Sequence, residues 1–402
     1  MNTKYIHIGK STILWEKTSF SRAFKFLKNN SLSRAELSDD NGNVKNIHYG
    51  DILIKFSECL YADEGNSIPY IINDNIAYKL LKLSPLINGD IVFADAAEDN
   101  TVGKCIEIIT HNDTDLVAGL HTIPCRPTIK FAEGYLGYYL NSSAFHNQLL
   151  QYIQGTKISS ISKKSICQTI ISYPSEIINQ QKIASYFQSL DSLIQSTSKK
   201  LVSLKQVKAA SLQSMFPQEG ETVPKVRFKG FEEEWKYEIL GKISSISIGE
   251  FVIQTKQRAN APYPVYNGGI TNTGYYDYFN QEGPKIIISA RGANAGFISK
   301  YKNRFWAGNS CYSIGINNNN WEFIYYFLQS KQDSYLKEQQ AANIPSISKK
   351  QIYTTNVLLP CYNEQIKIGL FFSNLDKQIS LQTQRLEKLK QIKAACLDKM
   401  FV

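Results

Sequence analysis

The chain has 402 residues, 43% of them hydrophobic, and a formal net charge of +10 at pH 7. This composition is typical of folded protein with two or three domains and excludes a disordered or fibrous chain. No run of residues reaches the about 18 consecutive apolar positions of a membrane span, and residues 1–7 lack the pattern of a secretory signal. We therefore expect a cytoplasmic protein that does not enter a membrane.

Two features of the composition bear on function. The seven cysteines are scattered and form no Cys-x-x-Cys pair, which argues against a zinc site and against a disulfide framework. The excess of lysine and arginine favours a polyanionic partner such as nucleic acid, because these side chains displace counterions from phosphates. We expect no bound metal.

Residues 1–158 are predicted to form a first strand-rich α+β domain. Short β-branched and aromatic runs, such as residues 51–56 and 89–93, are separated by glycine, asparagine and proline. Residues 17–34 hold five basic side chains and three phenylalanines without a single acid. A basic stretch interleaved with aromatic residues favours contact with nucleic acid.

Residues 159–217 are predicted to form a helical region with a long helix over about 179–215. Its apolar residues follow alternating steps of four and three, the spacing of a coiled-coil seam. Thr197 takes one seam position, where a polar side chain can fix the alignment of two helices. A helix of roughly 36 residues is about 54 Å long. The proline, glycine and acidic residues of 217–224 end this helix and form a linker.

Residues 218–344 are predicted to form a second strand-rich α+β domain after the linker. Residues 285–304 again hold five basic side chains and no acid. The glycine-rich stretch 289–296 follows an apolar strand, so we expect a loop that carries Arg291 and Asn294 outward. Arginine matches the hydrogen-bonding edge of guanine in the major groove, and asparagine matches that of adenine.

Residues 345–402 repeat the first helical region and are predicted to contain a second long helix over about 363–401. The letters Ser-Ile-Ser-Lys-Lys at 160–164 return at 346–350, and Leu-Lys-Gln-x-Lys-Ala-Ala also occurs in both copies. The copies lie too far apart for solenoid repeats. We infer two domain-plus-helix modules.

The two apolar stripes have the same register, which predicts that the long helices pair with each other. Gln382 takes the seam position of Thr197. The predicted pairing residues are Ile183, Phe187, Leu190, Ile194, Leu201, Leu204, Ile368, Phe372, Leu375, Ile379, Leu386 and Leu389. The opposite faces, which include Lys208 and Lys393, are interpreted as solvated surface or as a docking surface for a partner protein.

The two globular domains also share faint similarities. Ala118-Gly119 precedes a strand as Ala307-Gly308 does, and the Tyr-Tyr pair at 138–139 matches that at 325–326. The loops between these points differ, as expected of one scaffold with two readout surfaces. The predicted DNA-binding residues are Arg22, Lys25, Lys28, Arg34, Arg126, Lys157, Lys256, Arg258, Tyr266, Asn267, Arg291, Asn294, Lys300, Lys302 and Arg304.

No catalytic residue is predicted. The chain lacks a Gly-x-x-x-x-Gly-Lys-Ser/Thr phosphate loop, a dinucleotide-binding Gly-x-Gly-x-x-Gly, a His-Glu-x-x-His and the tetrapeptide that holds the target base in amino-methyltransferases. Glu234 and Lys236 match the tail of a nuclease metal site, but no Pro-Asp precedes them. The five histidines show no ligand spacing and are interpreted as surface or capping residues.

The repeated helical segments, with their shared Gln-x-Lys-Ile, Leu-Asp and Met-Phe letters, and the Val-Arg-Phe-Lys-Gly-Phe stretch at 226–231 followed by Trp235 resemble the specificity subunit of type I restriction-modification enzymes. The resemblance covers nearly the whole chain. It implies an α+β protein with an internal pseudo-twofold repeat, in which two target-recognition domains are separated by an antiparallel coiled coil. Residues 1–20 have no good match to the Arg-Phe…Trp opening of the second half.

The resemblance also implies partners. Each domain would read one half of a split target in double-stranded DNA, and the helices would set the gap. Two methylation subunits would bring S-adenosylmethionine, and restriction subunits would use ATP and Mg²⁺ for cleavage. The chain itself would be non-catalytic and bind no cofactor.

Two alternatives stay open from the residues alone. In the first alternative, the chain is a helical scaffold that binds acidic protein partners. In the second, which fits the repeat less well, it is a metal-dependent nuclease built around Glu234 and Lys236.

Overall fold

The computed structural model describes residues 4–8, 11–63, 68–112, 114–155, 158–337 and 345–401. The chain forms two compact units. Unit 1 comprises Met1–Thr197 and Arg385–Val402, and unit 2 comprises Ser198–Gln384. None of the helices in the described part of the chain is long and apolar enough to cross a membrane.

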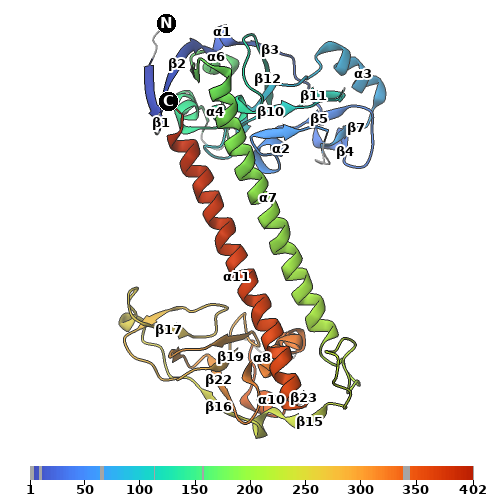
Figure 1. Cartoon of the computed structure of the whole chain (residues 1–402), viewed down its shortest axis with the longest axis vertical. Helices are drawn as coiled ribbons and strands as arrows, with labels where there is room; N and C mark the ends of the chain where they lie inside the picture. The colour runs from blue at the N-terminus through green and yellow to red at the C-terminus, as the bar shows by residue number, and fades with distance from the viewer. Residues whose placement is uncertain are drawn as a thin grey trace. The chain divides into compact units, whose positions relative to one another are not determined.

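Unit 1 is rich in short strands (Figure 1). These are β1 (Lys4–Ile8), β2 (Ser11–Ser19), β3 (Phe24–Phe26), β4 (Leu37–Ser38), β5 (Lys45–Ile47), β6 (Cys59–Tyr61), β7 (Tyr70–Ile71), β8 (Ile91–Ala94), β9 (Ala96–Ala97), β10 (Cys105–Ile109), β11 (Leu116–Ala118), β12 (Thr122–Pro127), β13 (Ser159–Ser160) and β14 (Ile170–Pro174). Its shorter helices are α1 (Phe20–Ala23), α2 (Tyr49–Ile54), α3 (Asp74–Leu83), α4 (Tyr135–Leu140), α5 (Ser143–Leu150) and α6 (Lys163–Cys167), with a 3-10 turn η1 (Arg34–Glu36).

Unit 2 has a similar mixture of elements. Its strands are β15 (Lys236–Ile239), β16 (Ser244–Ile248), β17 (Tyr263–Tyr266), β18 (Gly274–Tyr276), β19 (Lys285–Ser289), β20 (Ile298–Tyr301), β21 (Trp306–Ala307), β22 (Cys311–Ile316) and β23 (Asn356–Leu359). Its shorter helices are α8 (Trp321–Ser330), α9 (Gln332–Lys337) and α10 (Lys349–Tyr353), with 3-10 turns η2 (Leu240–Lys242) and η3 (Gln254–Lys256). The long helices α7 (Ile177–Ser214) and α11 (Tyr362–Lys399) each contribute residues to both units.

One sheet arrangement underlies both units. The largest sheet of unit 1 has the strand order β3-β12-β8-β10-β6, and that of unit 2 has the order β16-β22-β19-β20. The first four strands are antiparallel neighbours in each sheet. A second sheet pairs β5 with β11 in parallel in unit 1, and β17 with β21 in parallel in unit 2. The strands therefore correspond one to one over most of the scaffold.

The Ala-Gly pairs occupy the same place in the two units, as predicted. The N–H of Gly119 donates to the carbonyl of Ile47 at 2.8 Å, and the N–H of Gly308 donates to that of Tyr266 at 2.7 Å. Both glycines fit tightly against neighbouring residues, since an added Cβ would lie 2.4 Å or less from the side chain of Asn46 or Asn267. Conservation of the scaffold contact explains why these letters recur while the loops around them differ.

A buried tryptophan begins the same strand pair in both units. Trp15 of β2 pairs with Pro174 of β14. In unit 2, Lys236 of β15 pairs with Leu359 of β23. Trp235 precedes Lys236 and Pro360 follows Leu359, so Trp235 and Pro360 correspond to Trp15 and Pro174. Trp15 is 0% exposed and Trp235 is 2% exposed. The expected mismatch of residues 1–20 is thus wrong from Trp15 onward, because the strand is shared although its other letters differ.

The Arg-Phe part of the second opening fastens the linker to the start of α11 within unit 2. Arg227 donates two hydrogen bonds, of 2.7 and 2.8 Å, to the fully buried carboxylate of Glu364. The ring of Phe228 lies 6.2 Å from that of Phe371. In the first repeat Asn179 stands where Glu364 stands in the second. The missing Arg-Phe letters in the first half therefore coincide with the loss of their acidic partner.

A contact between tyrosine and phenylalanine aligns α4 with α8. The ring of Tyr138 lies 4.8 Å from that of Phe187, and the ring of Tyr326 lies 4.9 Å from that of Phe372. Because the two phenylalanines match in the repeats, Tyr138 corresponds to Tyr326. The predicted match of Tyr138 with Tyr325 is wrong by one residue, because matching both tyrosines of each pair selects a register that differs from the structural one, in which Tyr139 corresponds to Phe327.

Within each unit the end of one long helix lies beside the start of the other (Figure 1). In unit 1 the ring of Phe401 lies 5.7 Å from that of Phe187 near the start of α7. In unit 2 the ring of Phe216 lies 5.7 Å from that of Phe372 near the start of α11. All four rings are buried in the main apolar cluster of their unit. The phenylalanine of each repeated Met-Phe pair therefore fills part of the apolar core of a unit.

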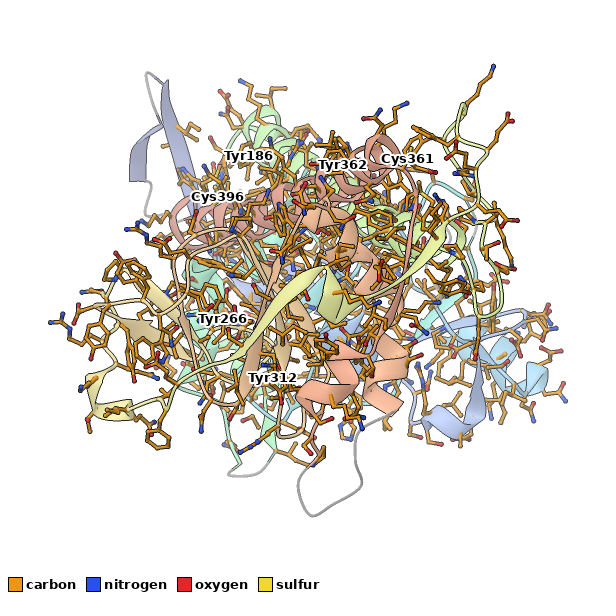
Figure 2. The ribbon with its side chains drawn as sticks, turned by 90° about the horizontal axis from the view of Figure 1, so that it is seen from below. Tyr186, Tyr266, Tyr312, Cys361, Tyr362 and Cys396 are labelled. Atoms are coloured by element: carbon orange, nitrogen blue, oxygen red, sulfur yellow. The ribbon has the colours of Figure 1, made fainter. Side chains whose placement is uncertain are left out.

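The long helices run antiparallel within each unit. In unit 1 the hydroxyl of Tyr186 in α7 lies 3.5 Å from Sγ of Cys396 in α11 (Figure 2). Most predicted pairing residues are buried, and Ile194, Leu204, Ile379 and Leu389 are half-buried. Thr197 is 5% exposed and Gln382 is half-buried. The boundaries proposed for the two domains and two helical regions stay predictions.

Candidate nucleic-acid interface

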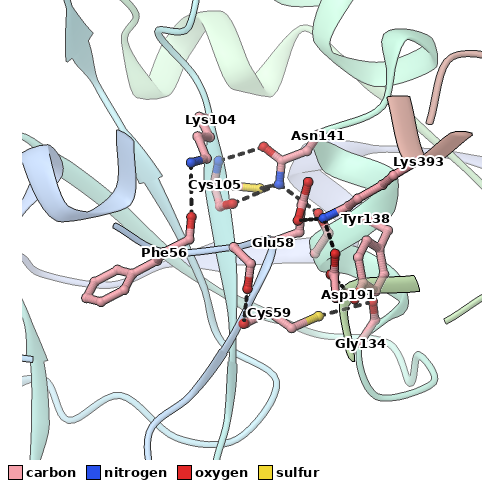
Figure 3. A network of polar contacts seen from close by, with 12 residues as sticks. Phe56, Glu58, Cys59, Lys104, Cys105, Gly134, Tyr138, Asn141, Asp191 and Lys393 are labelled. Atoms are coloured by element: carbon pink, nitrogen blue, oxygen red, sulfur yellow. Dashed lines mark hydrogen bonds and ion pairs between the residues drawn. The ribbon is translucent and has the colours of Figure 1, made fainter. Parts of the chain in front are cut away.

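Unit 1 contains a lysine held between two carboxylates (Figure 3). Lys393 Nζ lies 2.5 Å from Glu58 Oε2 and 2.6 Å from Asp191 Oδ1. The hydroxyl of Tyr138 donates to the other oxygen of Asp191 at 2.8 Å. Burial acts to lower the pKa of Lys393, but the two carboxylates outweigh it and raise that pKa above the ordinary lysine value. This cluster joins α11 to α7 and to α4.

Unit 2 contains the matching cluster with the opposite stoichiometry. Asp376 accepts from Lys208 Nζ at 2.7 Å, from Lys300 Nζ at 3.1 Å and from the hydroxyl of Tyr326 at 2.6 Å. Burial alone would raise the pKa of Asp376, but the hydrogen bonds from Lys208 and Tyr326 lower it. Lys208 and Lys393 are thus ion-paired within the protein, and their assignment to a solvated or partner-docking face is wrong.

Several predicted DNA-binding residues make ion pairs within their own unit. Arg126 donates to the fully buried Asp90, and Lys300 belongs to the cluster around Asp376. Four more residues form pairs that are at least partly exposed: Arg34 with Asp51, Arg258 with Asp277, Lys302 with Glu322, and Arg304 with Glu282. These contacts supply a structural role for each side chain, and any DNA contact by them stays a prediction.

Two further candidates shape a loop of unit 2. Asn267 Oδ1 accepts from the N–H of Ser310 at 3.0 Å, so its amide is used to hold the loop. Tyr266 packs against Tyr301 and Phe305, and burial raises the pKa of Tyr266 to about 12. Lys157 lies outside the described residues.

The side chains of the remaining candidates have no hydrogen-bond or ion-pair partner among the described residues. Arg22, Lys25 and Lys28 are exposed around the edge strand β3, and their side chains have no hydrogen-bond or ion-pair partner in the part of the chain that the structure describes. In unit 2, exposed Arg291 and half-buried Asn294 have side chains that are equally free among the described residues. Exposed Lys256 lies 6.0 Å from the ring of Tyr278. Free cations of this kind are available for phosphates and base edges.

Unit 1 also buries a carboxyl group beside a cavity of about 290 Å³. Glu107 lines this cavity and accepts the N–H of Gly134 at 2.8 Å and that of Gly137 at 2.7 Å, at the start of α4. Burial raises the pKa of Glu107 to about 7, against the opposing effect of these hydrogen bonds. The carboxyl group fixes the helix that carries Tyr138.

The residues of the nuclease alternative have a structural explanation. Glu234 and Lys236 are exposed on either side of Trp235, whose burial sets the spacing. Within the described ranges, no group of three or more His, Cys, Asp or Glu side chains is placed to hold a metal ion.

Comparison with known proteins gives the family. The model of the type I restriction modification DNA specificity domain matches residues 14–206 and 232–391. The chain belongs to this family. The two matches fall within the two modules and include Trp235, Asp191 and Asp376, whereas Lys208 and Lys393 lie just beyond the ends of the matched ranges.

Individual relatives of this specificity-domain family are distant in sequence. A putative type I restriction enzyme specificity subunit of Methanocaldococcus jannaschii is 23% identical over 337 residues, which cover 78% of this chain and 77% of that protein. A putative type I specificity subunit of Mycoplasma genitalium is 21% identical over 281 residues, covering 69% of this chain and 72% of that one.

Solved structures share the fold. The crystal structure of a type I restriction-modification S subunit from M. genitalium superposes with a TM-score of 0.66 at 16% identity, over 99% of this chain and 98% of that chain. A chain from a structural study of the assembly and conformational transition of the type I system superposes with a TM-score of 0.54, also at 16% identity, over 96% and 97% of the chains. The chain is a type I specificity subunit concerned with DNA sequence recognition.

The letters of this specificity subunit contained a signal for the ion-pair clusters. Asp191 and Asp376 match in the repeats, as do Lys208 and Lys393. Residues that recur in both copies of a long helix away from the seam are candidates for a shared contact. Glu58, just before β6, carries no such signal, because the additional ion-pair partner in unit 2 is Lys300 of β20, which has no counterpart at that position.

Proposed function

We propose that this chain reads a split DNA target, with one block of bases recognised by each unit, for a complex whose chemistry resides in other subunits. One observation carries the proposal. The same scaffold occurs twice, each copy completed by the ends of both long helices, while the loops on the scaffold differ between the copies. A duplicated scaffold with different loops suits the recognition of two different short sequences.

The free cations support a DNA partner. Arg22, Lys25 and Lys28 in unit 1 and Arg291 in unit 2 are exposed and have no acidic partner among the described residues. Such side chains bind phosphates with release of counterions, and an arginine can also discriminate between base edges.

The partners and cofactors are part of the same proposal. Methylation subunits supply S-adenosylmethionine and methylate adenines within the target. Restriction subunits supply ATP- and Mg²⁺-dependent cleavage. The specificity chain binds neither cofactor, and α7 and α11, with 38 residues and about 57 Å each, act as the spacer that sets the gap between the blocks.

The test is to co-express the chain with the methylation subunit from the same genome and to map adenine methylation across a plasmid by single-molecule sequencing. We expect methylation at a split motif of two short blocks around a fixed gap. The control is the methylation subunit without the chain, which should give no motif. Absent or random methylation despite a stable complex would overturn the proposal and favour a scaffold that binds only proteins.

A further inference from the structure

A hairpin loop occupies the same place in each unit. Residues 95–102, which include β9, lie between β8 and β10, and residues 290–295 lie between β19 and β20. Each loop ends at a glycine with φ of +86°, a conformation that favours glycine. The N–H of Gly103 donates to the carbonyl at the end of β8 at 2.9 Å, and that of Gly296 does so at the end of β19 at 2.7 Å. We name these equivalent segments reading loop 1 and reading loop 2.

The repeated Ser-Ile-Ser-Lys-Lys letters bind both reading loops through the backbone. Ser160 pairs with Ala96 of reading loop 1, and Ser346 forms the equivalent bridge with Arg291 of reading loop 2. The isoleucine that follows each serine is buried and donates its N–H to the first residue of the loop at 2.9 Å. The motif therefore holds the loop to the scaffold in the same register twice, whatever the loop's own side chains are.

The exposed side chains of the two loops differ in charge. Reading loop 1 presents Glu98, which has no hydrogen-bond or ion-pair partner in the described ranges, whereas Asp99 accepts from the N–H and hydroxyl of Thr101 at 2.9 and 2.5 Å. Reading loop 2 presents Arg291, at the position that Ala96 holds in reading loop 1, and Asn294. A carboxylate accepts from the amino group of cytosine, whereas arginine donates to guanine and asparagine pairs with adenine. The loops thus carry different base preferences.

A pair of lysines follows each clamp directly. Lys163 and Lys164 in unit 1, and Lys349 and Lys350 in unit 2, are exposed and have no carboxylate partner among the described residues. Lys163 Nζ donates to the carbonyl of Leu27 at 3.4 Å, which places it near the exposed Lys28. A lysine is a compact point charge suited to a phosphate rather than to a base edge. Identical lysines beside different loops fit a contact that does not depend on sequence.

We infer that the Ser-Ile-Ser-Lys-Lys motif is a clamp that positions a base-reading loop and contacts the adjacent DNA phosphates with its lysine pair, with Glu98 reading in unit 1 and Arg291 with Asn294 in unit 2. This inference rests on the proposed function and extends it to named specificity-determining residues. It assigns the sequence-dependent part of recognition to the loops and the sequence-independent part to the repeated motif.

The first test maps the methylation motif of the complex carrying Glu98→Gln or Arg291→Ala. We expect each variant to lose about tenfold or more of its discrimination at one position in one block, a different block for each variant, while the other block and the gap stay unchanged. Asp40→Asn, which removes the same charge at another exposed position of unit 1, is the matched control and should leave both blocks intact. Unchanged motifs in both loop variants would overturn the inference.

The second test measures binding of the complex to a duplex containing the mapped target and to an unrelated duplex over a range of salt concentrations. Lys163→Met with Lys164→Met, and separately Lys349→Met with Lys350→Met, should weaken binding to both duplexes by the same factor and reduce the salt dependence by about two ions. The matched control is Lys199→Met with Lys200→Met on α7, which also removes two exposed positive charges. A loss confined to the target duplex, or no loss in either clamp variant, would contradict the phosphate contact.

The outcomes separate the inference from the proposed function. A wild-type complex that methylates no split motif removes the proposed function itself. A wild-type complex that methylates a split motif, with loop variants that leave it unchanged, removes the reading loops alone.

Discussion

Lys393 Nζ lies 2.6 Å from Asp191 Oδ1, although the two residues belong to different repeats of the chain. The equivalent pair in unit 2 reverses the roles of the repeats, because Lys208 of the first contacts Asp376 of the second at 2.7 Å. As many residues separate Asp191 from Lys208 as separate Asp376 from Lys393. The residues that the two repeats share therefore include those that form ion pairs between the repeats.

Removal of Lys393 is expected to destabilise unit 1. Lys393→Met leaves the partly buried carboxylates of Glu58 and Asp191 close together without their cation, so we expect a loss of roughly 2 kcal/mol in the free energy of unfolding. The check is the urea midpoint of the first unfolding transition. Lys390→Met, three residues away on the exposed side of α11, should change stability by less than about 0.5 kcal/mol. Equal effects of the two variants would mean that the buried cluster does not stabilise the unit.

Glu107 should make unit 1 less stable as the pH rises through the acidic range. Burial raises its pKa from the ordinary glutamate value of 4.5 to about 7 in the folded state, so the folded chain binds a proton that the unfolded chain has lost between these values. Stability from this group is complete below pH 4.5 and is lost as pH rises toward 7, by an amount on the order of 3 kcal/mol.

The measurement is the urea midpoint of the chain and of Glu107→Gln at pH values from 4.5 to 8. The difference in stability between the two proteins should shift in favour of the variant as the pH rises. Glu219→Gln, an exposed acid of the linker, should give a difference that does not vary in this range. A flat difference for Glu107→Gln would show that the carboxyl group is ionised throughout.

Basic residues that sequence reasoning grouped together should separate into two kinds. Arg22→Met removes an exposed and unpaired charge, so we expect unchanged stability, weaker binding to all DNA sequences alike and a salt dependence reduced by about one ion. Arg126→Met leaves the buried Asp90 without its cation, so we expect a loss of roughly 3 kcal/mol of stability. Thermal unfolding and salt-dependent DNA binding of both variants are the measurements. Equal stability of the two variants would contradict this division.

The sequence alone could not divide the basic residues into exposed, unpaired ones and those that form ion pairs within the protein. Repetition revealed the modules and the long helices. Each copy must keep the same apolar seam along its helix and the same phenylalanine, Phe216 or Phe401, that packs in an apolar core. The roles of Arg126 and Lys300 could not be predicted, because their acidic partners lie far away in the sequence. The place of Trp15 was missed because one residue type in a strand carries little signal when its neighbours on the exposed face have changed.

The spacer role of the helices calls for insertions in both of them. The antiparallel pairing places the point after Lys199 in α7 opposite the point after Gln384 in α11, as the equal spacing of the two ion pairs requires. Seven residues added at both points keep each unit's contacts and the seam pattern, and lengthen each helix by about 10 Å. At about 3.4 Å per base pair, the gap in the methylated motif should grow by about three base pairs with both blocks unchanged.

Seven residues added in α7 alone provide the control. That variant cannot satisfy the Lys393–Asp191 and Lys208–Asp376 pairs together unless the extra residues loop out, so we expect lost stability or an unchanged gap. Methylation mapping of both variants, with circular dichroism to verify helical content, is the measurement. An unchanged gap in the folded double insertion would show that the helices do not set the spacing.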